Sequence, residues 1–196
     1  MDTQSLILDR LRRSLAAKED FVHASLAEVQ RLAAMIQATL EAGGKLLIFG
    51  NGGSAADAQH LAAEFVNRFL INRRPLAALA LTTDTSTLTA IGNDFHFDQI
   101  FAKQIEALGK KEDLALGIST SGNSANVLLA MEAARAIGMT RAALTGGLQH
   151  PGGQLAPLCD LVLNVPSDAT PHIQETHLFI EHLLCELVER EMFPQS

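Results

Sequence analysis

His60 and Glu64 are a pair of side chains whose types and spacing suit proton transfer. They lie four residues apart in a segment that is helical by propensity and contains no Gly or Pro, so both face one side of the helix. An imidazole and a carboxylate that act together can give and take protons. A solvated helix face would carry the same two residues, so the pair alone leaves both interpretations open.

A second group of polar side chains falls near the end of the chain, in a helix expected over residues 170–191. On a helical wheel Gln174 and His182 lie about 80° apart, whereas His177 and His182 lie about 140° apart. We therefore expect Gln174 and His182 to share a side and His177 to point elsewhere. Three other histidines fall in expected loops and are interpreted as solvated: His96, His150 and His172.

Four hydroxyl side chains lie between an apolar run at residues 114–118 and the next expected helix: Ser119, Thr120, Ser121 and Ser124. Ligands bind at the carboxyl ends of strands in open α/β sheets. Hydroxyls and free N–H groups at a helix N-terminus suit a phosphate monoester without any lysine. The alternative is an ordinary polar turn, but a helix cap requires fewer hydroxyls, so the segment predicts a phosphate site.

A glycine turn, Gly50-Asn51-Gly52-Gly53, follows another apolar run at residues 46–49, and Ser54 then suits a helix cap. Strand, glycine turn and helix together can hold an anion on free N–H groups. The dinucleotide-binding pattern would place a glycine where Ala55 stands, and the Walker lysine is missing. The turn therefore indicates an α/β fold and an anion-binding site, but it does not identify a particular class of nucleotide or phosphate ligand.

The elements that must position these residues alternate along the chain. Apolar runs predict five strands, at residues 46–49, 76–81, 114–118, 141–144 and 161–165. Helices are expected at residues 55–69, 98–108, 123–137 and 170–191, with a chain break at residues 92–94. This alternation predicts a doubly wound parallel sheet with helices on both faces. A leading helical arm, residues 3–42 with a break near 23–25, either packs against a partner subunit or covers a sheet face.

The composition excludes several classes of protein. The 196 residues suit one domain, with 47% hydrophobic and 19% charged residues. A net charge of −7 argues against a nucleic-acid surface, and no apolar run is long enough to span a membrane. The first 20 residues lack the apolar core of a signal peptide. The two cysteines, Cys159 and Cys185, suggest no disulfide framework, so a cytoplasmic location is expected.

Four motifs together resemble the phosphoheptose isomerase family of the sugar-isomerase (SIS) domain superfamily: GNGGSAADAQHLAAE, TAIGNDF, GISTSGNSANV and IQETHLFIEH. The resemblance implies a single SIS domain over residues 1–196, folded as a flavodoxin-like three-layer α/β/α sandwich, with the arm at residues 1–43 used in oligomerisation. It implies a homotetramer with active sites at subunit interfaces. The implied reaction converts sedoheptulose 7-phosphate to D-glycero-D-manno-heptose 7-phosphate, an early step towards ADP-heptose and the lipopolysaccharide core.

The resemblance also implies roles for individual residues. Glu64 and His182 match the acid/base pair, and a zinc ion would be held by His60, Glu64, Gln174 and His182. The other substrate-binding positions are Asn51, Gly52, Gly53, Ser54, Asn93, Asp94, Ser119, Thr120, Ser121 and Ser124. A zinc-bound carboxylate is a weaker base, so Glu64 is either a ligand of the resting enzyme or the base once substrate has entered. Gln174 and His182 stand roughly 12 Å apart along one helix. Either Gln174 therefore precedes the helix, or a neighbouring subunit completes the site.

Two departures and two rival functions accompany the resemblance. His172 stands where relatives often have Arg, and residues 146–153 lack the charged pair of relatives, so the mouth of the site is expected to differ. One rival is a non-catalytic SIS-domain protein that associates with the replication initiator. That protein lacks the glutamate and histidine present here as Glu64 and His182, which favours an enzyme. The other rival is an isomerase of another sugar phosphate.

Overall fold

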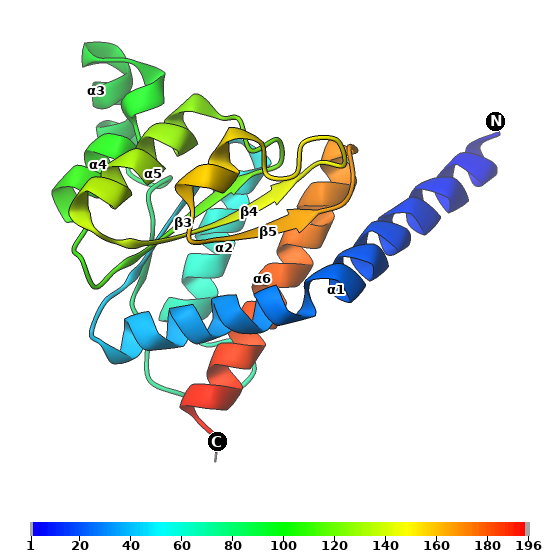
Figure 1. The fold of residues 1–196 in the computed structure, drawn as a ribbon, viewed down its shortest axis with the longest axis horizontal. Coiled ribbons are helices and arrows are strands. Elements are labelled where there is room, and N and C mark those ends of the chain that lie inside the picture. Colours follow the sequence, from blue (N-terminus) through cyan, green and yellow to red (C-terminus); the bar gives the residue numbers. More distant parts are fainter. Residues whose placement is uncertain (1, 195–196) are drawn as a thin grey trace.

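A computed structural model describes residues 2–194 (Figure 1), and five parallel strands form its central sheet. The strands are β1 (Leu46–Gly50), β2 (Ala78–Ala80), β3 (Leu114–Ser119), β4 (Thr140–Gly146) and β5 (Leu161–Val165). Their order is β2-β1-β3-β4-β5, which is the flavodoxin-like order. The predicted doubly wound parallel sheet is therefore confirmed.

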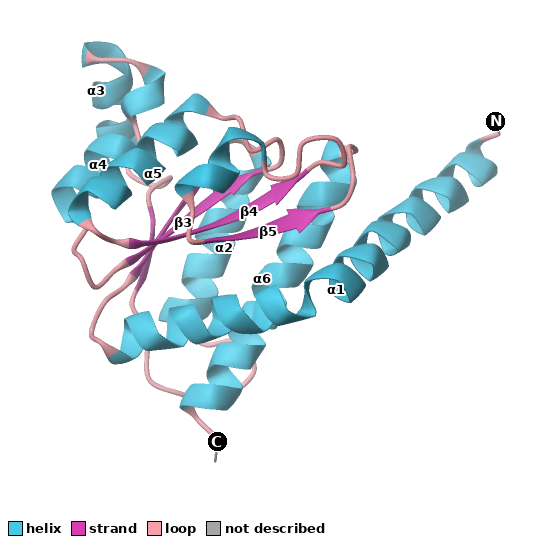
Figure 2. Ribbon diagram, in the orientation of Figure 1, coloured by secondary structure: helices cyan, strands magenta, loops and turns pink. Residues whose placement is uncertain are grey.

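Helices cover both faces of the sheet (Figures 1 and 2). They are α1 (Thr3–Glu41), α2 (Gly53–Val66), α3 (Thr85–Asp94), α4 (Ala102–Leu108), α5 (Ala125–Ile137) and α6 (Thr170–Met192), with 3₁₀ turns at Phe97–Gln99 and Gly153–Leu158. Successive side chains of a strand face opposite sides. Leu46 and Ile48 accordingly pack with α1, α2 and α6, whereas Leu47 and Phe49 pack with α4 and α5. Two apolar layers therefore sandwich the sheet.

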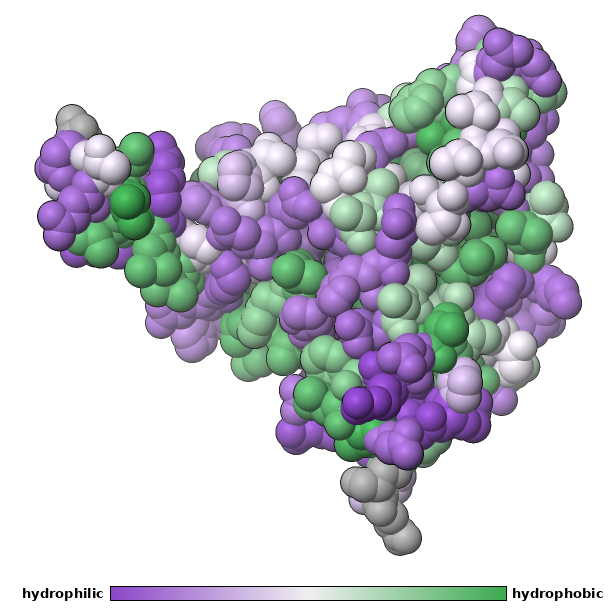
Figure 3. All heavy atoms as spheres, turned by 180° about the vertical axis from the view of Figure 1, so that it is seen from behind, coloured by the Kyte–Doolittle hydropathy of each residue, from purple (hydrophilic) through white to green (hydrophobic). Residues whose placement is uncertain are grey.

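Helix α1 bends at Ser25, whose φ of −131° and ψ of 21° are not helical, as the predicted break near residues 23–25 required. Its second half packs on the sheet, whereas its N-terminal turns project from the body as an arm (Figure 1); Ala17 and Phe21, just before the bend, still belong to the buried core. Apolar side chains of the arm show as green atoms in Figure 3, and they are 41–63% exposed: Leu6, Ile7, Leu8, Leu11 and Leu15. The arm thus presents apolar surface to its surroundings.

Several boundaries differ from the sequence prediction, among them β2, which covers Ala78–Ala80 and not the predicted residues 76–81. The expected break at residues 92–94 is wrong, because these residues lie in α3, which begins where Asp84 accepts a hydrogen bond from Thr87 N. A Cβ at Gly92 would meet no atom within 4 Å, so this glycine is not needed for a turn. Helix α2 ends at Val66, which leaves Phe69 in a loop. The helix expected at 98–108 is a 3₁₀ turn followed by a shorter α4.

None of the helices in residues 2–194 is long and apolar enough to cross a membrane.

Candidate active site

The glycine turn and the hydroxyl segment lie next to each other at the carboxyl edge of the sheet. β1 and β3 are paired neighbours, with Gly50 opposite Ile118, so the turn after β1 and the segment after β3 leave the sheet side by side. The strand order reverses between these two strands, and ligands of doubly wound folds bind at such a switch point. The topology therefore places both predicted anion-binding segments at one site.

The hydroxyl segment lies beside a cavity of about 240 Å³. Thr120 and Ser121 line it from β3–α5, and residues of the 146–150 loop and the start of α6 line the other side. Ser119 Oγ and Ser124 Oγ lie 3.0 Å apart, and no side chain caps α5. No Lys or Arg is among the residues that line this cavity in the described part of the chain. Besides His150 and Asp168, which also line the cavity, hydroxyls and backbone N–H groups are thus what it offers an anion.

The glycine turn is tied to the hydroxyl segment by a reciprocal pair of hydrogen bonds. The amide of Asn51 donates to Asn126 Oδ1, and the amide of Asn126 donates to Asn51 Oδ1, both over 2.8 Å. Asn126 is 4% exposed and stands at the start of α5. Sequence reasoning missed it, although it lies two residues after Ser124. The pair holds the two predicted anion-binding segments together.

Gly53 allows the chain to pass close to α6. A Cβ at Gly53 would lie 2.2 Å from Gln174 Nε2, so any other residue would displace that side chain. Gly52 has a φ of 57°, which suits glycine. Ser54 is buried in the first turn of α2. Of the residues of the predicted glycine turn, Gly53 is therefore the one that lies against α6, where it meets the side chain of Gln174.

Three predicted acid/base or metal-binding residues converge where α2 and α6 lie side by side. The Nε2 atoms of His60 and His182 are 2.9 Å apart, and Glu64 Oε1 is 3.8 Å from His60 Nε2. His60 and Glu64 are partly exposed, at 39% and 24% of their side chains. The ring of Phe69 stacks on His182, with centroids 5.4 Å apart and planes 21° apart. The cluster forms within one chain and is open to a ligand.

Gln174 is held apart from that cluster by a carboxylate that the sequence analysis did not single out. Its Nε2 donates to Asp57 Oδ2 over 3.0 Å. Burial raises the pKa of Asp57, while the bond from Gln174 and the charge of His60 oppose the rise. Asp57 precedes His60 by three residues on α2, and this helical spacing is the signal that could have identified it.

Glu181 is a second buried acid beside Asp57. It is 0% exposed, and neither carboxyl oxygen has a hydrogen-bond partner among residues 2–194. Burial raises its pKa to about 9, and the charge of Asp57 adds to the rise. The carboxyl group is therefore neutral at pH 7 and adds no charge to the site.

Three other predictions have different outcomes. Asn93 and Asp94 lie exposed on α3, and no side-chain hydrogen bond in residues 2–194 joins them to the other predicted site residues. His177 points elsewhere as predicted, because it is 0% exposed and its Nε2 meets Thr145 O at 2.9 Å. The prediction of a solvated loop position for His172 is wrong. It lies in the first turn of α6 and is 6% exposed.

The side chains of His60, His182 and Glu64 are of the types that bind zinc. Two imidazole nitrogens that face each other, with a carboxylate nearby, form a nitrogen and oxygen set that zinc accepts. Two neutral imidazoles at this distance must place a proton or a cation between their nitrogens. No group of three or more His, Cys, Asp or Glu side chains in residues 2–194 is arranged as a complete metal site. Any complete set therefore needs Gln174 or a further ligand.

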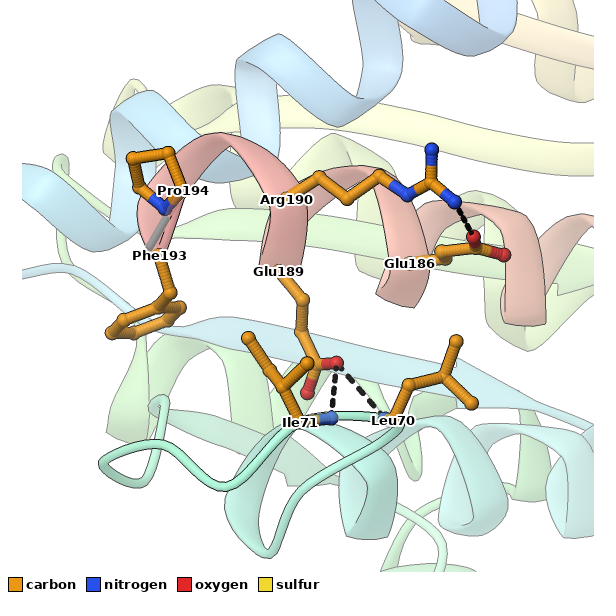
Figure 4. Close-up of a pocket in the computed structure, with 7 residues that line it drawn as sticks. All are labelled: Leu70, Ile71, Glu186, Glu189, Arg190, Phe193 and Pro194. Carbon is orange, nitrogen blue, oxygen red and sulfur yellow. Dashed lines mark hydrogen bonds and ion pairs between the residues drawn. The ribbon is translucent and has the colours of Figure 1, made fainter. Parts of the chain in front are cut away.

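A buried ion pair supports the loop that carries Phe69. Glu189 on α6 accepts hydrogen bonds from Phe69 N, Leu70 N and Ile71 N over 2.8–3.2 Å, and from Arg73 Nε over 2.8 Å. Figure 4 shows Glu189 reaching from the helix to this loop, at the edge of a pocket of about 420 Å³. Glu189, Arg73 and the three backbone N–H groups, together called the Glu189 clamp, thereby hold Phe69 against His182.

Comparison with known proteins gives one consistent result. The SIS domain family matches residues 11–146 of the chain. A phosphoheptose isomerase from Solidesulfovibrio magneticus is 55% identical over 190 residues, which cover 96% of this chain and 90% of the relative. Another from Helicobacter pylori is 48% identical over 189 residues, covering 94% and 97% of the two chains.

Two solved structures are similar over nearly their whole length. A phosphoheptose isomerase from Francisella tularensis aligns with a TM-score of 0.92 and 41% identity, covering 97% of this chain and 100% of the other. One from Neisseria gonorrhoeae aligns with a TM-score of 0.90 and 43% identity, covering 96% and 99%.

Proposed function

This chain belongs to the phosphoheptose isomerase family of SIS-domain proteins, and from that premise we propose that it converts sedoheptulose 7-phosphate to D-glycero-D-manno-heptose 7-phosphate. The family predicted from the four motifs is confirmed, and the chain is an aldose–ketose isomerase. The reaction would supply heptose for ADP-heptose and the lipopolysaccharide core. The observation that carries the proposal is the meeting of three side chains: His60 and Glu64, roughly two and three turns into α2 after the glycine turn, and His182 of α6.

The substrate phosphate is bound by Ser119, Thr120, Ser121 and Ser124. Thr120 and Ser121 border a cavity without Lys or Arg in its described lining, and Ser119 and Ser124 lie beside them in the same segment, so charge is balanced by hydrogen bonds and by the N-terminus of α5. The sugar extends from there along the glycine turn, past Asn51, Gly52, Gly53 and Ser54, towards α6. A phosphate anchored at one end places the reacting carbons a fixed distance away, beside α2 and α6.

Proton transfer is assigned to Glu64 and His182. Ketose–aldose conversion moves one proton between adjacent carbons and another between their oxygens, through an enediol. Glu64 takes the carbon-bound proton and returns it to the neighbouring carbon. Its carboxylate lies 3.8 Å from His60 Nε2, beyond hydrogen-bond reach, so its oxygens are free to accept. His182 moves the proton between the oxygens, with its ring held by Phe69.

Zinc is proposed as the cofactor, one per subunit. His60, His182 and Gln174 would hold it, with Glu64 as a further ligand in the resting enzyme. Bound there, zinc would polarise the substrate carbonyl and stabilise negative charge on the enediolate.

A homotetramer is proposed as the working assembly. Helix α3 has no buried residue, and Phe95 and Phe97 next to it are 54% and 66% exposed. The arm at residues 1–43 adds further exposed apolar side chains. Gln174 lies inside α6, so the alternative that it precedes the helix is wrong. We place Asn93 and Asp94 of one subunit at the site of another, since they stay apart from the site in a single chain.

A coupled assay with sedoheptulose 7-phosphate tests the function. Turnover by the parent protein that is lost in Glu64→Gln supports an isomerase in which Glu64 is the base. Turnover only with a different sugar phosphate would favour the second rival, and no turnover with any would favour a non-catalytic SIS-domain regulator. Cytoplasmic location is proposed because Cys159 and Cys185 are both free thiols, as a reducing compartment maintains.

A further inference from the structure

Among the described residues that line the cavity of about 240 Å³, His150 is the one that can carry a positive charge. Thr120 and Ser121 of the hydroxyl segment line the same cavity. Asp168 adds a carboxylate from the segment after β5. The charge of the described lining is therefore negative whenever the imidazole of His150 is neutral.

A phosphate monoester that binds in this cavity brings more negative charge than the N-terminus of α5 can balance. Its charge near pH 7 is about −1.5 to −2. A helix N-terminus supplies the equivalent of about +0.5, and hydroxyls carry no net charge. The carboxylate of Asp168 repels the same anion. A cation beside the hydroxyl segment would therefore strengthen phosphate binding.

The loop that carries His150 is fixed to the hydroxyl segment at one end. Gln154 N donates a hydrogen bond to Asn123 Oδ1 over 3.1 Å. A Cβ added at Gly122 would lie 2.2 Å from Gly152 O, so the loop and the segment approach each other as closely as two backbones can. His150 thus belongs to a loop that lies directly against the proposed phosphate-binding residues.

The other end of the loop is fixed to β5 and to the segment that follows it. Asn164 on β5 accepts a hydrogen bond from Gly152 N over 2.8 Å and donates one to Gly147 O over 3.0 Å. Asp168 Oδ1 accepts a hydrogen bond from Leu148 N over 2.9 Å. Both ends of the loop are therefore held, and its tip is kept beside the cavity.

The imidazole of His150 has no other task in the folded chain. Its residue is exposed, and no side-chain hydrogen bond or ion pair within residues 2–194 engages its ring. His150 borders both the phosphate cavity and a second pocket of about 460 Å³. The ring can therefore turn to a ligand in the cavity without breaking an existing contact.

We propose that His150 is a substrate-binding residue, whose protonated imidazole donates a hydrogen bond to the phosphate and balances part of its charge. The inference rests on the proposed function, because it takes the ligand to be a sugar phosphate. Histidine side chains ordinarily titrate near about pH 6.5, so the contribution is present at lower pH and is lost as the pH rises.

Asp168 is the other titratable group that faces His150 across the described lining of the cavity, and the second pocket adds none. Carboxyl side chains ordinarily titrate near about pH 4. A change in anion binding between pH 5.5 and pH 8 that depends on His150 therefore reports the imidazole.

The test measures sulfate binding by calorimetry at pH 5.5 and pH 8, at constant ionic strength. Sulfate is doubly charged at both pH values, so only the protein titrates. The parent should bind sulfate about three- to tenfold more tightly at pH 5.5. His150→Gln should lose most of that preference, whereas His150→Lys, whose charge persists at pH 8, should bind tightly at both. The matched control is His23→Gln on α1, 77% exposed, which should behave as the parent.

Steady-state kinetics with sedoheptulose 7-phosphate gives a second readout. At pH 6 His150→Gln should raise KM by about three- to tenfold, and more than it lowers kcat, because the residue lies at the phosphate end of the substrate. His150→Lys should restore KM, which a merely structural role of the imidazole would not predict.

Two results would overturn the inference and leave the isomerase assignment intact. One is parental sulfate affinity and KM in His150→Gln, in a protein where Ser121→Ala/Ser124→Ala is impaired. The other is sulfate binding that neither of these variants weakens. A parent whose sulfate binding depends on His150, but which turns over no sugar phosphate, would instead refute the proposed function and leave the anion-binding role of His150 standing.

Discussion

His60 and His182, which are 122 residues apart in the sequence, have their Nε2 atoms 2.9 Å apart and their rings edge to face. One histidine comes from α2 and the other from α6, so neither helix alone contains the pair. Both nitrogens point at the same space, and Glu64 adds a carboxylate beside it. The chemistry proposed for this protein depends on these two imidazoles and the Glu64 carboxylate lying close together.

Replacement of the proposed base should abolish turnover. Glu64→Gln keeps the shape of the side chain but cannot take a proton, so kcat should fall by about 10²–10⁴. Phosphate binding should persist, because the hydroxyl segment is untouched. The coupled assay measures kcat, and inhibition by inorganic phosphate checks the anion site. A variant that retains activity within about tenfold of the parent would exclude Glu64 as the base.

Loss of hydroxyls should weaken substrate binding. The double variant Ser121→Ala/Ser124→Ala removes one hydroxyl that lines the cavity, whose described lining has no Lys or Arg, and a second hydroxyl at the start of α5. Hydrogen bonds to charged groups contribute about 1.5–3 kcal/mol each, so KM should rise at least about tenfold. Steady-state kinetics over a range of substrate concentrations separates KM from kcat. An unchanged KM would place the phosphate elsewhere.

The Glu189 clamp should matter for stability. Burial raises the pKa of Glu189, but three backbone N–H groups and Arg73 more than offset this and hold it below its ordinary value. Glu189→Gln leaves Arg73 without a charged partner, at a cost of about 3–5 kcal/mol in the free energy of unfolding. Urea unfolding measures the loss. Glu186→Gln, one turn earlier and paired with exposed Arg190, is the control and should cost less than about 1 kcal/mol.

The same clamp gives a pH dependence. A carboxylate whose pKa is lowered on folding contributes stability above its unfolded value of 4.5, and that contribution disappears as the pH falls through the folded value. The stability difference between the parent and Glu189→Gln should therefore shrink at acid pH. A gap that stays constant from pH 7 to pH 3 would argue against the charged clamp.

Glu181→Gln should stabilise the protein. The folded chain holds a proton on Glu181, with a pKa of about 9, that the unfolded chain releases above its ordinary 4.5. Stability from this group is complete below pH 4.5 and is lost as the pH rises towards 9, so the parent is penalised at neutral pH. Because glutamine has no proton to lose, the variant should gain on the order of 2 kcal/mol at pH 7. Thermal melts at pH 5 and 8 should show the gain increasing with pH.

Subunit mixing should separate residues that act in one chain from those that act between chains. Glu64 and His182 meet within a chain, so a mixture of Glu64→Gln and His182→Ala should recover no activity. A mixture of Asp94→Asn and His182→Ala should recover activity at about a quarter of sites, if each site pairs two subunits of a symmetric oligomer. Native mass spectrometry confirms exchange. Recovery in the first mixture would contradict the single-chain cluster.

The sequence by itself determined the elements and the local faces. Apolar runs identified all five strands, most fully β1 and β3, because a parallel strand buried on both faces needs an unbroken apolar segment; β2, which is partly exposed, is shorter than the run that predicted it. The break near Ser25 and the hydroxyl segment after β3 could also be read from local residue types. The four motifs were enough to identify the family.

Only the tertiary structure decided which side chains meet. Helical spacing places His60 and Glu64 on one face of α2, but it cannot tell which distant helix that face touches. The sheet order brings α6 beside α2, which pairs His182 with His60 and Gln174 with Asp57. The same packing buries His172. Helix α3, in contrast, has no buried residue in the single chain. Contacts between elements depend on how the layers stack, and no local pattern carries that information.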